Sequence, residues 1–483
     1  MKLAIVQRIL GLLLMLFSLT MLPPLAVSLH YQDGNWTAFS DSLAALAAVG
    51  FVAWWPVRHK RRELRLRDGF LVVAAFWVVL GIAGAVPLLL AERPDMSSID
   101  SLFEALAGFT TTGATVLVGL DDLPKSILYY RQQIQWLGGI GIVVLAVALL
   151  PMLGIGGMQL LRAETPGPVK DARLTPRITE TAKALWIVYV TITALCAFGY
   201  WAAGMPMFDA ISYSFSTVST GGFTPHDASL GFYDSPAIEF VAVVFMIIGS
   251  INFSLHFLAW RYRRLSDYTR DPELRAFVAI LLVSIVLCAL TLWLTRTVRV
   301  PSHALRLALV QAVSMQTTSG FVTDDFSLWP GALPVLLLLV TFIGGCASST
   351  SGGMKVIRWL MMWKQGSREV VRLIHPSAAL PVKLGNKAID WRVVDAVSGF
   401  FAVYMVCFGV LMVSLMATGV DQITAFSAIA TCMNNAGPGL GHVAANFTAI
   451  SDAGKLICVL AMLLGRLEVF PLLVLVTPTF WRR

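Results

Sequence analysis

The sequence predicts an all-α polytopic membrane protein. Three observations lead to this class: 57% of the 483 residues are hydrophobic and only 13% are charged, long apolar runs recur along the chain, and one glycine-containing turn occurs in several copies. An ordinary soluble protein carries about twice this fraction of charged residues. We expect a hairpin of two N-terminal helices, followed by four pseudo-repeated units of helix, short pore helix, loop and helix around one pore.

Charge supports a layout of ten membrane spans. A span needs about 20 apolar residues, and most lysines and arginines fall at the termini or in alternate loops between such segments. Basic loops stay in the cytoplasm, so we expect both termini to be cytoplasmic in a bacterial inner membrane. The opposite face is rich in aspartate, which concentrates cations. The predicted spans are residues 9–29, 38–56, 70–91, 134–156, 183–203, 236–260, 276–296, 332–358, 393–418 and 454–478.

The first apolar run has an alternative interpretation as a signal peptide. Lys2 and Arg8 precede it, and a small-residue AVS sequence lies near its end. The apolar stretch is longer than that of a usual signal peptide, and another apolar segment follows within roughly ten residues. We therefore expect the first of two helices in a hairpin.

Cysteine and histidine spacing argues against a catalytic or metal centre. The six cysteines form no CxxC pair, the seven histidines form no HExxH motif, and no P-loop, GxSxG or strand-associated GxGxxG motif occurs. The sequence therefore disfavours an enzyme, a zinc site and a disulfide framework. The net charge of +8 fits basic cytoplasmic loops, so we expect no nucleic acid partner and no organic cofactor.

Four turns rich in glycine and hydroxyl groups can be aligned. They read TTTGAT from Thr110, STGGFT from Ser219, TTSGFV from Thr317 and NNAGPG from Asn434, and the fourth residue of each is glycine. One such turn alone is more often an ordinary loop, but four at intervals of roughly 108 residues indicate a repeat. We therefore divide the chain into a two-helix region, residues 1–68, and four pore units, residues 69–165, 166–272, 273–388 and 389–483.

The segment before each turn is moderately apolar and too short to cross a bilayer. We expect a half-helix there, with Asp100 and Asp209 as N-caps in units 1 and 2, and with Ser302 and either Asp421 or Thr424 in looser positions in units 3 and 4. A half-helix that runs inward directs the partial negative charge of its C-terminus at the centre, which favours a cation.

The turns themselves are expected to form a filter of backbone carbonyl groups. Irregular backbone at membrane depth is tolerated where it is buried in protein or lines a water-filled cavity, and glycine allows successive carbonyl groups to face one side. Carbonyl dipoles replace the hydration shell of potassium, whereas a divalent cation favours carboxylates. The predicted K⁺ ligands are the backbone groups of Thr111, Thr112, Gly113, Thr220, Gly221, Gly222, Thr318, Ser319, Gly320, Asn435, Ala436 and Gly437.

These motifs resemble the TrkH branch of the Trk/Ktr/HKT potassium transporters over essentially the whole chain. Further matches are GGCASSTSGGMK from Gly344, LIHP from Leu373 and GRLEVF from Gly465. The resemblance implies potassium uptake by a homodimer with a cytoplasmic nucleotide-binding subunit of the TrkA type. In plant relatives a serine at the first filter glycine accompanies sodium transport, so Gly113 favours potassium. The fourth unit departs most from the pattern, because NNAGPG replaces a threonine-rich turn.

Ten small residues interrupt the eighth predicted span, and helix propensity is poor there. They predict a loop beneath the filter, although small residues also allow close helix contacts; the resemblance implies an intramembrane gate. The predicted gate residues are Gly344, Gly345, Cys346, Ala347, Ser348, Ser349, Thr350, Ser351, Gly352 and Gly353, together with Arg466.

Arg466 is a basic residue deep inside a predicted span, where a charge needs water or a partner. It is either a structural tie between helices or, as the resemblance implies, a positive charge below the filter that contacts the gate. The long basic segment from Lys355 to Arg392 follows the gate and could couple it to a cytoplasmic regulator.

Two other functions remain open from sequence. A potassium symporter driven by protons or sodium would also contain broken helices and glycine loops near the bilayer midplane. A membrane-embedded hydrolase or a receptor is a weaker alternative, because no catalytic constellation accompanies the apolar segments. The basic loops could contact anionic lipid head groups or a protein ring.

Overall fold

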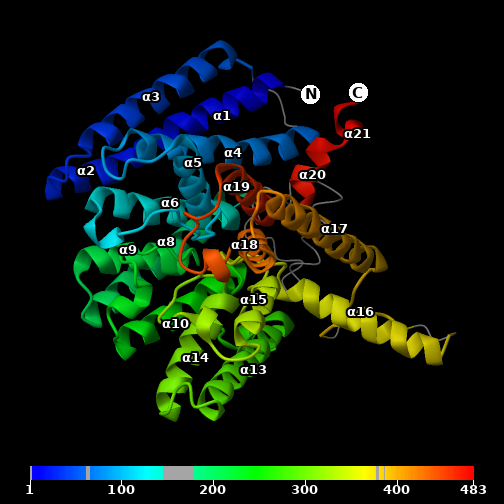
Figure 1. Cartoon of the computed structure of the whole chain (residues 1–483). Coiled ribbons are helices and arrows are strands. Elements are labelled where there is room, and N and C mark those ends of the chain that lie inside the picture. Colours follow the sequence, from blue (N-terminus) through cyan, green and yellow to red (C-terminus); the bar gives the residue numbers. More distant parts are fainter. Residues whose placement is uncertain (1–2, 61–65, 145–177, 377–379, 386, 483) are drawn as a thin grey trace.

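The chain is described by a computed structural model over residues 3–60, 66–144, 178–376, 380–385 and 387–482, and these residues are almost entirely helical (Figure 1). The N-terminal hairpin consists of α1 (Leu3–Ser18) and α2 (Leu22–Tyr31), which together form one candidate span, and α3 (Trp36–Trp54). Gly11 and Gly50 allow α1 and α3 to approach closely, since a Cβ built on either would lie 2.8 Å from the carbonyl oxygen of the other.

The remaining helices follow the four predicted units in order. Unit 1 contains α4 (Leu66–Leu90), α5 (Ser98–Phe109) and α6 (Lys125–Val144). Unit 2 contains α8 (Ile178–Ala202), α9 (Met207–Val218), α10 (Pro236–Ser250), α11 (Phe253–Tyr262) and α12 (Ser266–Arg270). Unit 3 contains α13 (Pro272–Leu294), α14 (Pro301–Gln316), α15 (Leu333–Ile343) and α16 (Val356–Ile374). Unit 4 contains α17 (Trp391–Met416), α18 (Gln422–Asn434), α19 (Asp452–Arg466), α20 (Phe470–Val476) and α21 (Pro478–Trp481).

Two short strands are the described exception to this helical architecture. β1 (Lys383–Leu384) and β2 (Lys387–Ala388) pair antiparallel, with Lys383 opposite Ala388. They follow α16, which extends away from the other helices in Figure 1.

Among the described residues, six helices are long and apolar enough to cross a membrane, or eight if each of two bent pairs counts as one span. Six of the ten predicted spans coincide closely with these six helices, and the eighth overlaps α15. The fourth predicted span is described only as far as Val144, because residues 145–177 lie outside the described part. The prediction of a helical polytopic protein agrees with this arrangement.

The sixth and tenth predicted spans are each broken into two helices. α10 and α11 meet at an angle of 95°, where the Asn252 side chain caps α11 by accepting from the amide of Ser254 at 2.8 Å. α19 and α20 meet at 114°, where Glu468 and Val469 have positive φ and Pro471 begins the next helix. The residue before a proline disfavours helical backbone, so Pro471 was the available sequence signal.

The predicted N-caps were right in one unit and wrong in three; in unit 3, α14 begins after Val300 without a side-chain cap, so Ser302 is not its cap. Asp421 caps α18 by accepting from the amide of Thr424 at 3.1 Å. In α5 the cap is Ser97, which accepts from the amide of Asp100 at 3.1 Å, and α9 begins after Pro206 without a side-chain cap. Asp209 instead binds groups from the outer loop, as described below.

Two large apolar cores hold the units together. One is formed mainly by the N-terminal hairpin with units 1 and 4, and the other mainly by units 2 and 3, while a third, small core joins units 3 and 4. In the first core the Phe103 ring of α5 contacts Phe447, with ring centroids 5.3 Å apart. The last unit therefore packs against the first, which is the contact that a closed ring of four units requires.

Candidate functional site

The four predicted turns each follow directly on a short helix. α5, α9, α14 and α18 contain 12, 12, 16 and 13 residues, which is too short to cross a bilayer. In every turn the amide of the third residue donates back to a carbonyl of this helix: Thr112 to Ala107, Gly221 to Ser216, Ser319 to Ser314 and Ala436 to Thr431, at 2.8 to 2.9 Å. The N–H groups of these third residues are therefore occupied.

All four turns also have the same backbone conformation. In each, φ is positive at the glycine and at the residue two positions earlier, and the values are 52° and 76° for Thr111 and Gly113, 52° and 82° for Thr220 and Gly222, 55° and 75° for Thr318 and Gly320, and 53° and 83° for Asn435 and Gly437. Positive φ is a genuine outlier for β-branched threonine. Its repetition in three units, with asparagine in the fourth, marks strained backbone of the kind found at functional sites.

The turns meet in one closed ring. A Cβ built on each filter glycine would collide with the carbonyl oxygen of the next unit's third turn residue: Gly113 with Gly221 at 2.1 Å, Gly222 with Ser319 at 2.1 Å, Gly320 with Ala436 at 2.5 Å, and Gly437 with Thr112 at 2.8 Å. The fourth contact returns to unit 1. The structure therefore brings all four predicted turns together, and only glycine fits at each seam.

The twelve predicted ligand positions are not equivalent. The carbonyl oxygens of the third turn residues lie at the seams between units, and the Gly221 oxygen also accepts a hydrogen bond from Gln135 Nε2 at 2.7 Å. The glycines border open space, because all four line one outer cavity of about 700 Å³. Asp227, Asp324 and Asp325 also line this cavity, and their charges favour the entry of cations.

A buried ion pair braces the ring from behind. Arg131 Nε lies 2.7 Å from Glu104 Oε1, and both side chains are almost completely buried. The guanidinium also donates to the Thr224 carbonyl at 3.2 Å and to Thr115 Oγ1 at 3.1 Å. Thr115 and Thr224 each follow their filter glycine by two positions, so Arg131 joins equivalent points of units 1 and 2. Sequence reasoning placed Arg131 in an outer loop and missed this role.

The predicted gate residues form a loop that ends α15 and contacts the underside of three turns. Thr350 Oγ1 donates to the Val218 carbonyl at 3.0 Å, Gly352 N donates to Thr318 Oγ1 at 2.6 Å, and Gly353 N donates to the Asn434 carbonyl at 2.9 Å. The loop is buried throughout except at Gly353, which is half-buried. Small residues are required here, since a Cβ on Gly352 would lie 2.0 Å from the Asn434 carbonyl oxygen.

Arg466 connects this gate loop to unit 1. It is 3% exposed, and its two terminal nitrogens donate to the carbonyl oxygens of Thr350 at 3.0 Å and Gly138 at 3.2 Å. A single guanidinium on α19 of unit 4 thus binds the gate loop of unit 3 and helix α6 of unit 1. Both sequence interpretations of Arg466 therefore describe contacts that the structure contains.

Several charged residues at the gate were missed from sequence. Lys355 and Arg358 were assigned to a cytoplasmic loop, but both are buried. The Lys355 ammonium donates to the Ser351 carbonyl, and Arg358 Nη2 pairs with Glu468 at 2.6 Å. Glu273 is also buried, and its Oε1 accepts from the amide of Ala347 at 2.7 Å. Their burial was missed because a basic residue at the end of an apolar run resembles an ordinary residue flanking a membrane span.

A charged cluster joins units 1 and 2 on the outer face. His226 lies between two carboxylates, with Nδ1 hydrogen-bonded to Asp121 and Nε2 3.3 Å from Asp209. Its ring stacks on Phe232 at 3.6 Å, and the Tyr233 hydroxyl donates to Asp209 at 2.5 Å. Burial alone would lower the pKa of His226, but hydrogen bonds to Asp209 and Asp121 outweigh burial and raise the pKa above its ordinary value of 6.5.

This cluster predicts a pH-dependent stability. Because the pKa of His226 is raised on folding, its stabilising effect is complete below pH 6.5 and is lost as the pH rises through the higher folded-state pKa. We expect the difference in melting temperature between the wild type and His226→Gln to shrink as the pH rises above 6.5. Thermal unfolding of the purified protein measures it, with exposed His303→Gln as control. A difference that grows with pH would contradict the assignment.

Comparison with known proteins identifies the family. The family model described as TrkH, a cation transport protein, matches residues 36–482. The Trk system potassium uptake protein TrkH of Halomonas elongata is 54% identical over 483 residues, covering all of both chains, and that of Escherichia coli K12 is 52% identical over 99% of both. The crystal structure of the potassium transporter TrkH from Vibrio parahaemolyticus superimposes with a TM-score of 0.93 at 51% identity, covering all of both chains.

These comparisons confirm the resemblance inferred from the sequence motifs and the expectation that the chain is not an enzyme. The family match covers nearly the whole chain, and the relatives match over their full lengths. The chain therefore belongs to the TrkH family of cation transport proteins.

Proposed function

We propose that this protein takes up potassium across the bacterial inner membrane through a single-chain, channel-like pore. The observation that carries the proposal is the ring of four turns, in which each filter glycine contacts the turn of the next unit. The names of the relatives, which are potassium uptake proteins, support the choice of ion. For this pore we propose the layout predicted from the sequence: ten spans, the five segments with the predicted boundaries, and both termini in the cytoplasm.

The proposed ligands of K⁺ are the backbone carbonyl oxygens of the four turns. A ring of carbonyl dipoles suits a weakly hydrated monovalent cation. The half-helices α5, α9, α14 and α18 end at the turns, so their C-terminal partial charges add to the negative potential. The carboxylates around the outer cavity raise the local concentration of cations before they enter.

The gate that we propose is the loop of residues 344–353, held by Arg466. Its hydrogen bonds to the undersides of the turns of units 2, 3 and 4 support a closed arrangement, in which the loop obstructs the path below the filter. Opening requires these bonds and the Arg466–Thr350 bond to break.

Regulation is proposed to come from a cytoplasmic nucleotide-binding subunit of the TrkA type acting on a homodimer. α16 supports this idea, because it starts immediately after the gate loop and extends away from the other helices (Figure 1). Trp363 and Leu373 on this helix are 76% and 84% exposed, and exposed apolar side chains of this size mark contact surfaces.

The test of the proposed function is ion flux through the purified protein in liposomes. We expect potassium and rubidium to compete for uptake and sodium to compete poorly. Gly113→Ser adds the Cβ that would meet the Gly221 carbonyl oxygen, so it should lower potassium uptake as well as weaken this discrimination. Uptake should proceed without an inward proton or sodium gradient to drive it. Uptake that requires such a gradient would replace the channel by a symporter, and absence of potassium uptake by well-folded protein would overturn the proposal.

Arg466→Ala is expected to raise basal potassium flux. The substitution removes two charged hydrogen bonds, one of them to the gate loop, and a loss of about 1.4 kcal/mol from the closed arrangement corresponds to about a tenfold increase in flux. The measurement is flux in liposomes without regulatory subunit. Arg466→Lys retains the positive charge, but an ammonium group does not reproduce the two hydrogen bonds of the planar guanidinium, so this variant should give an intermediate flux. Unchanged or abolished flux in well-folded Arg466→Ala would contradict the assigned role.

A further inference from the structure

An apolar groove lies on the outside of unit 2, away from the ring of turns. It has a volume of about 560 Å³, within the usual range for a ligand site. Its walls come from α8, α10, α11, α12 and α13, and the residues that line it are Ile187, Val188, Thr191, Ile192, Ile247, Ile248, Ile251, His256, Trp260, Tyr268, Leu274 and Val278. At its polar end His256 Nδ1 lies 2.8 Å from the Tyr268 hydroxyl.

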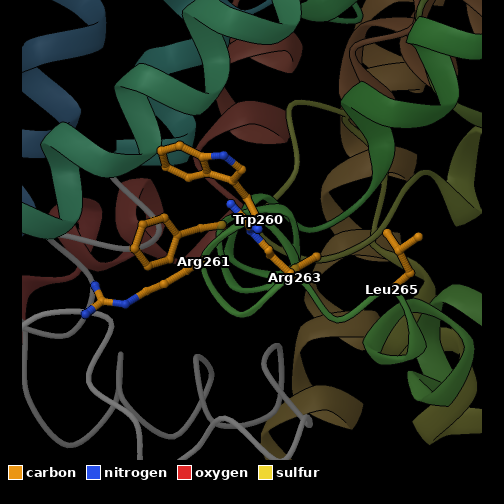
Figure 2. A pocket seen from close by; sticks show the side chains of 6 residues that line it. Trp260, Arg261, Arg263 and Leu265 are labelled. Atoms are coloured by element: carbon orange, nitrogen blue, oxygen red, sulfur yellow. The ribbon is translucent and has the colours of Figure 1, made fainter.

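A basic cavity adjoins the groove and shares Trp260 with it. This cavity measures about 690 Å³, and Arg261 and Arg263 are among its lining residues. Figure 2 shows Arg263 beside Trp260, with Arg261 extending to the left and Leu265 on the right. An apolar groove therefore continues into a positively charged rim.

The depth of the two cavities fits the inner leaflet of a bilayer. α10 and α11 meet at 95°, and α11 leads into the segment that carries Arg261, Arg263, Arg264, Arg270 and Arg275. Trp260 is 65% exposed, and tryptophan beside basic residues is typical of the membrane–water interface on the cytoplasmic side.

The groove also backs directly onto the gate loop. Ile247, Ile248 and Ile251 line the groove, and the two residues between them bind the gate: the Gly249 carbonyl accepts from Thr350 N at 3.2 Å and the Ser250 carbonyl accepts from Cys346 N at 2.9 Å. His256 Nε2 also bonds to the Ile248 carbonyl, at 2.9 Å. Whatever fills the groove therefore touches the same helix end that holds the gate loop in place.

We propose that these two cavities bind one anionic phospholipid of the inner leaflet. An acyl chain occupies the groove, and the phosphate of the head group pairs with Arg261 and Arg263. The bound lipid braces the bend between α10 and α11 and so favours the gate-loop arrangement described above, because a ligand stabilises the conformation that it binds best. The effect on gating rests on the proposed function, whereas the lipid site does not.

Lipid retention tests the site without measuring transport. The protein is purified in detergent with dioleoylphosphatidylglycerol or dioleoylphosphatidylcholine, and bound lipid is counted by native mass spectrometry. We expect tighter binding of phosphatidylglycerol, and about a 30-fold loss of its affinity in Arg261→Gln/Arg263→Gln, which corresponds to about 1 kcal/mol per arginine. The matched control is Arg296→Gln/Arg299→Gln, which removes two exposed arginines elsewhere and should change nothing.

A second pair of variants tests the groove itself. Thr191→Trp places a large ring in the groove and should reduce phosphatidylglycerol binding, whereas Val283→Trp changes an exposed position of α13 outside the groove and should not. Equal retention of both lipids by the wild type, or equal retention of phosphatidylglycerol by all variants, would overturn the proposal.

Flux in liposomes then separates binding from gating. We expect phosphatidylglycerol to lower basal potassium flux severalfold relative to phosphatidylcholine, and this difference to disappear in Arg261→Gln/Arg263→Gln. Selective binding with identical flux in both lipids would overturn the gating effect alone. Absence of flux in every lipid would count against the proposed function, while the retention measurements would still decide the lipid site.

Discussion

Gly113→Ala is expected to lower potassium uptake by roughly a hundredfold, which corresponds to about 2.7 kcal/mol. Two effects combine at this position. Gly113 has φ +76°, a conformation that costs an alanine about 1–2 kcal/mol. The added methyl group would also lie 2.1 Å from the Gly221 carbonyl oxygen, which is backbone and cannot rotate away. The ring must open at this seam, and flux in liposomes measures the loss.

Gly119→Ala is the matched control for this experiment. Gly119 also has positive φ, at +68°, and also lines the outer cavity, but a Cβ there would meet nothing within 4 Å. It carries the same backbone penalty without the collision, so uptake should remain close to that of the wild type. Equal losses in the two variants would show that contact at the seam is not what the filter requires.

Arg131→Ala is expected to destabilise the protein by about 3–5 kcal/mol, because it leaves the buried Glu104 carboxylate without its cation. Thr115 Oγ1 and the amide of Val116 would still donate to Glu104, at 2.9 Å each, so the chain should remain foldable. Chemical or thermal unfolding in detergent measures the loss. The double variant Glu104→Gln/Arg131→Met should lose less than Arg131→Ala, since no unpaired charge remains.

An exposed ion pair provides the comparison. Arg368 and Glu369 on α16 lie 2.9 Å apart and are 26% and 45% exposed, and pairs of this kind contribute about 0–1 kcal/mol. Arg368→Met should therefore change stability little. If Arg131→Ala lowered the stability no more than Arg368→Met does, the ion pair of Arg131 and Glu104 would not be stabilising the ring.

The turns could be predicted from sequence because their requirement is local. A φ of +75° to +83° at the fourth position of each turn favours glycine there whatever surrounds it. The four glycines therefore appear as a repeat in the printed sequence, and their convergence follows from the need to bury irregular backbone. The interruption at Gly344 was predictable for the same reason, because ten small residues cannot continue an apolar helix.

The supporting charges could not be predicted, since their roles depend on contacts between distant segments. Arg131 has the same local sequence character as any outer-loop arginine, and its partner Glu104 belongs to another helix. Arg358 is separated from Glu468 by 110 residues. Asp209 was expected to cap a helix, but Tyr233 and His226 reach it from the following loop and bind it more directly than the helix amides do.

The closed circle of glycine contacts has a consequence for genetics. In a tetramer of identical chains, any filter substitution appears four times at once, whereas here each quadrant has its own codon. The four seams also differ in tightness, from 2.1 Å at Gly113 and Gly222 to 2.8 Å at Gly437. Alanine introduced one quadrant at a time should therefore produce graded phenotypes, with the junction between the last quadrant and the first the most forgiving.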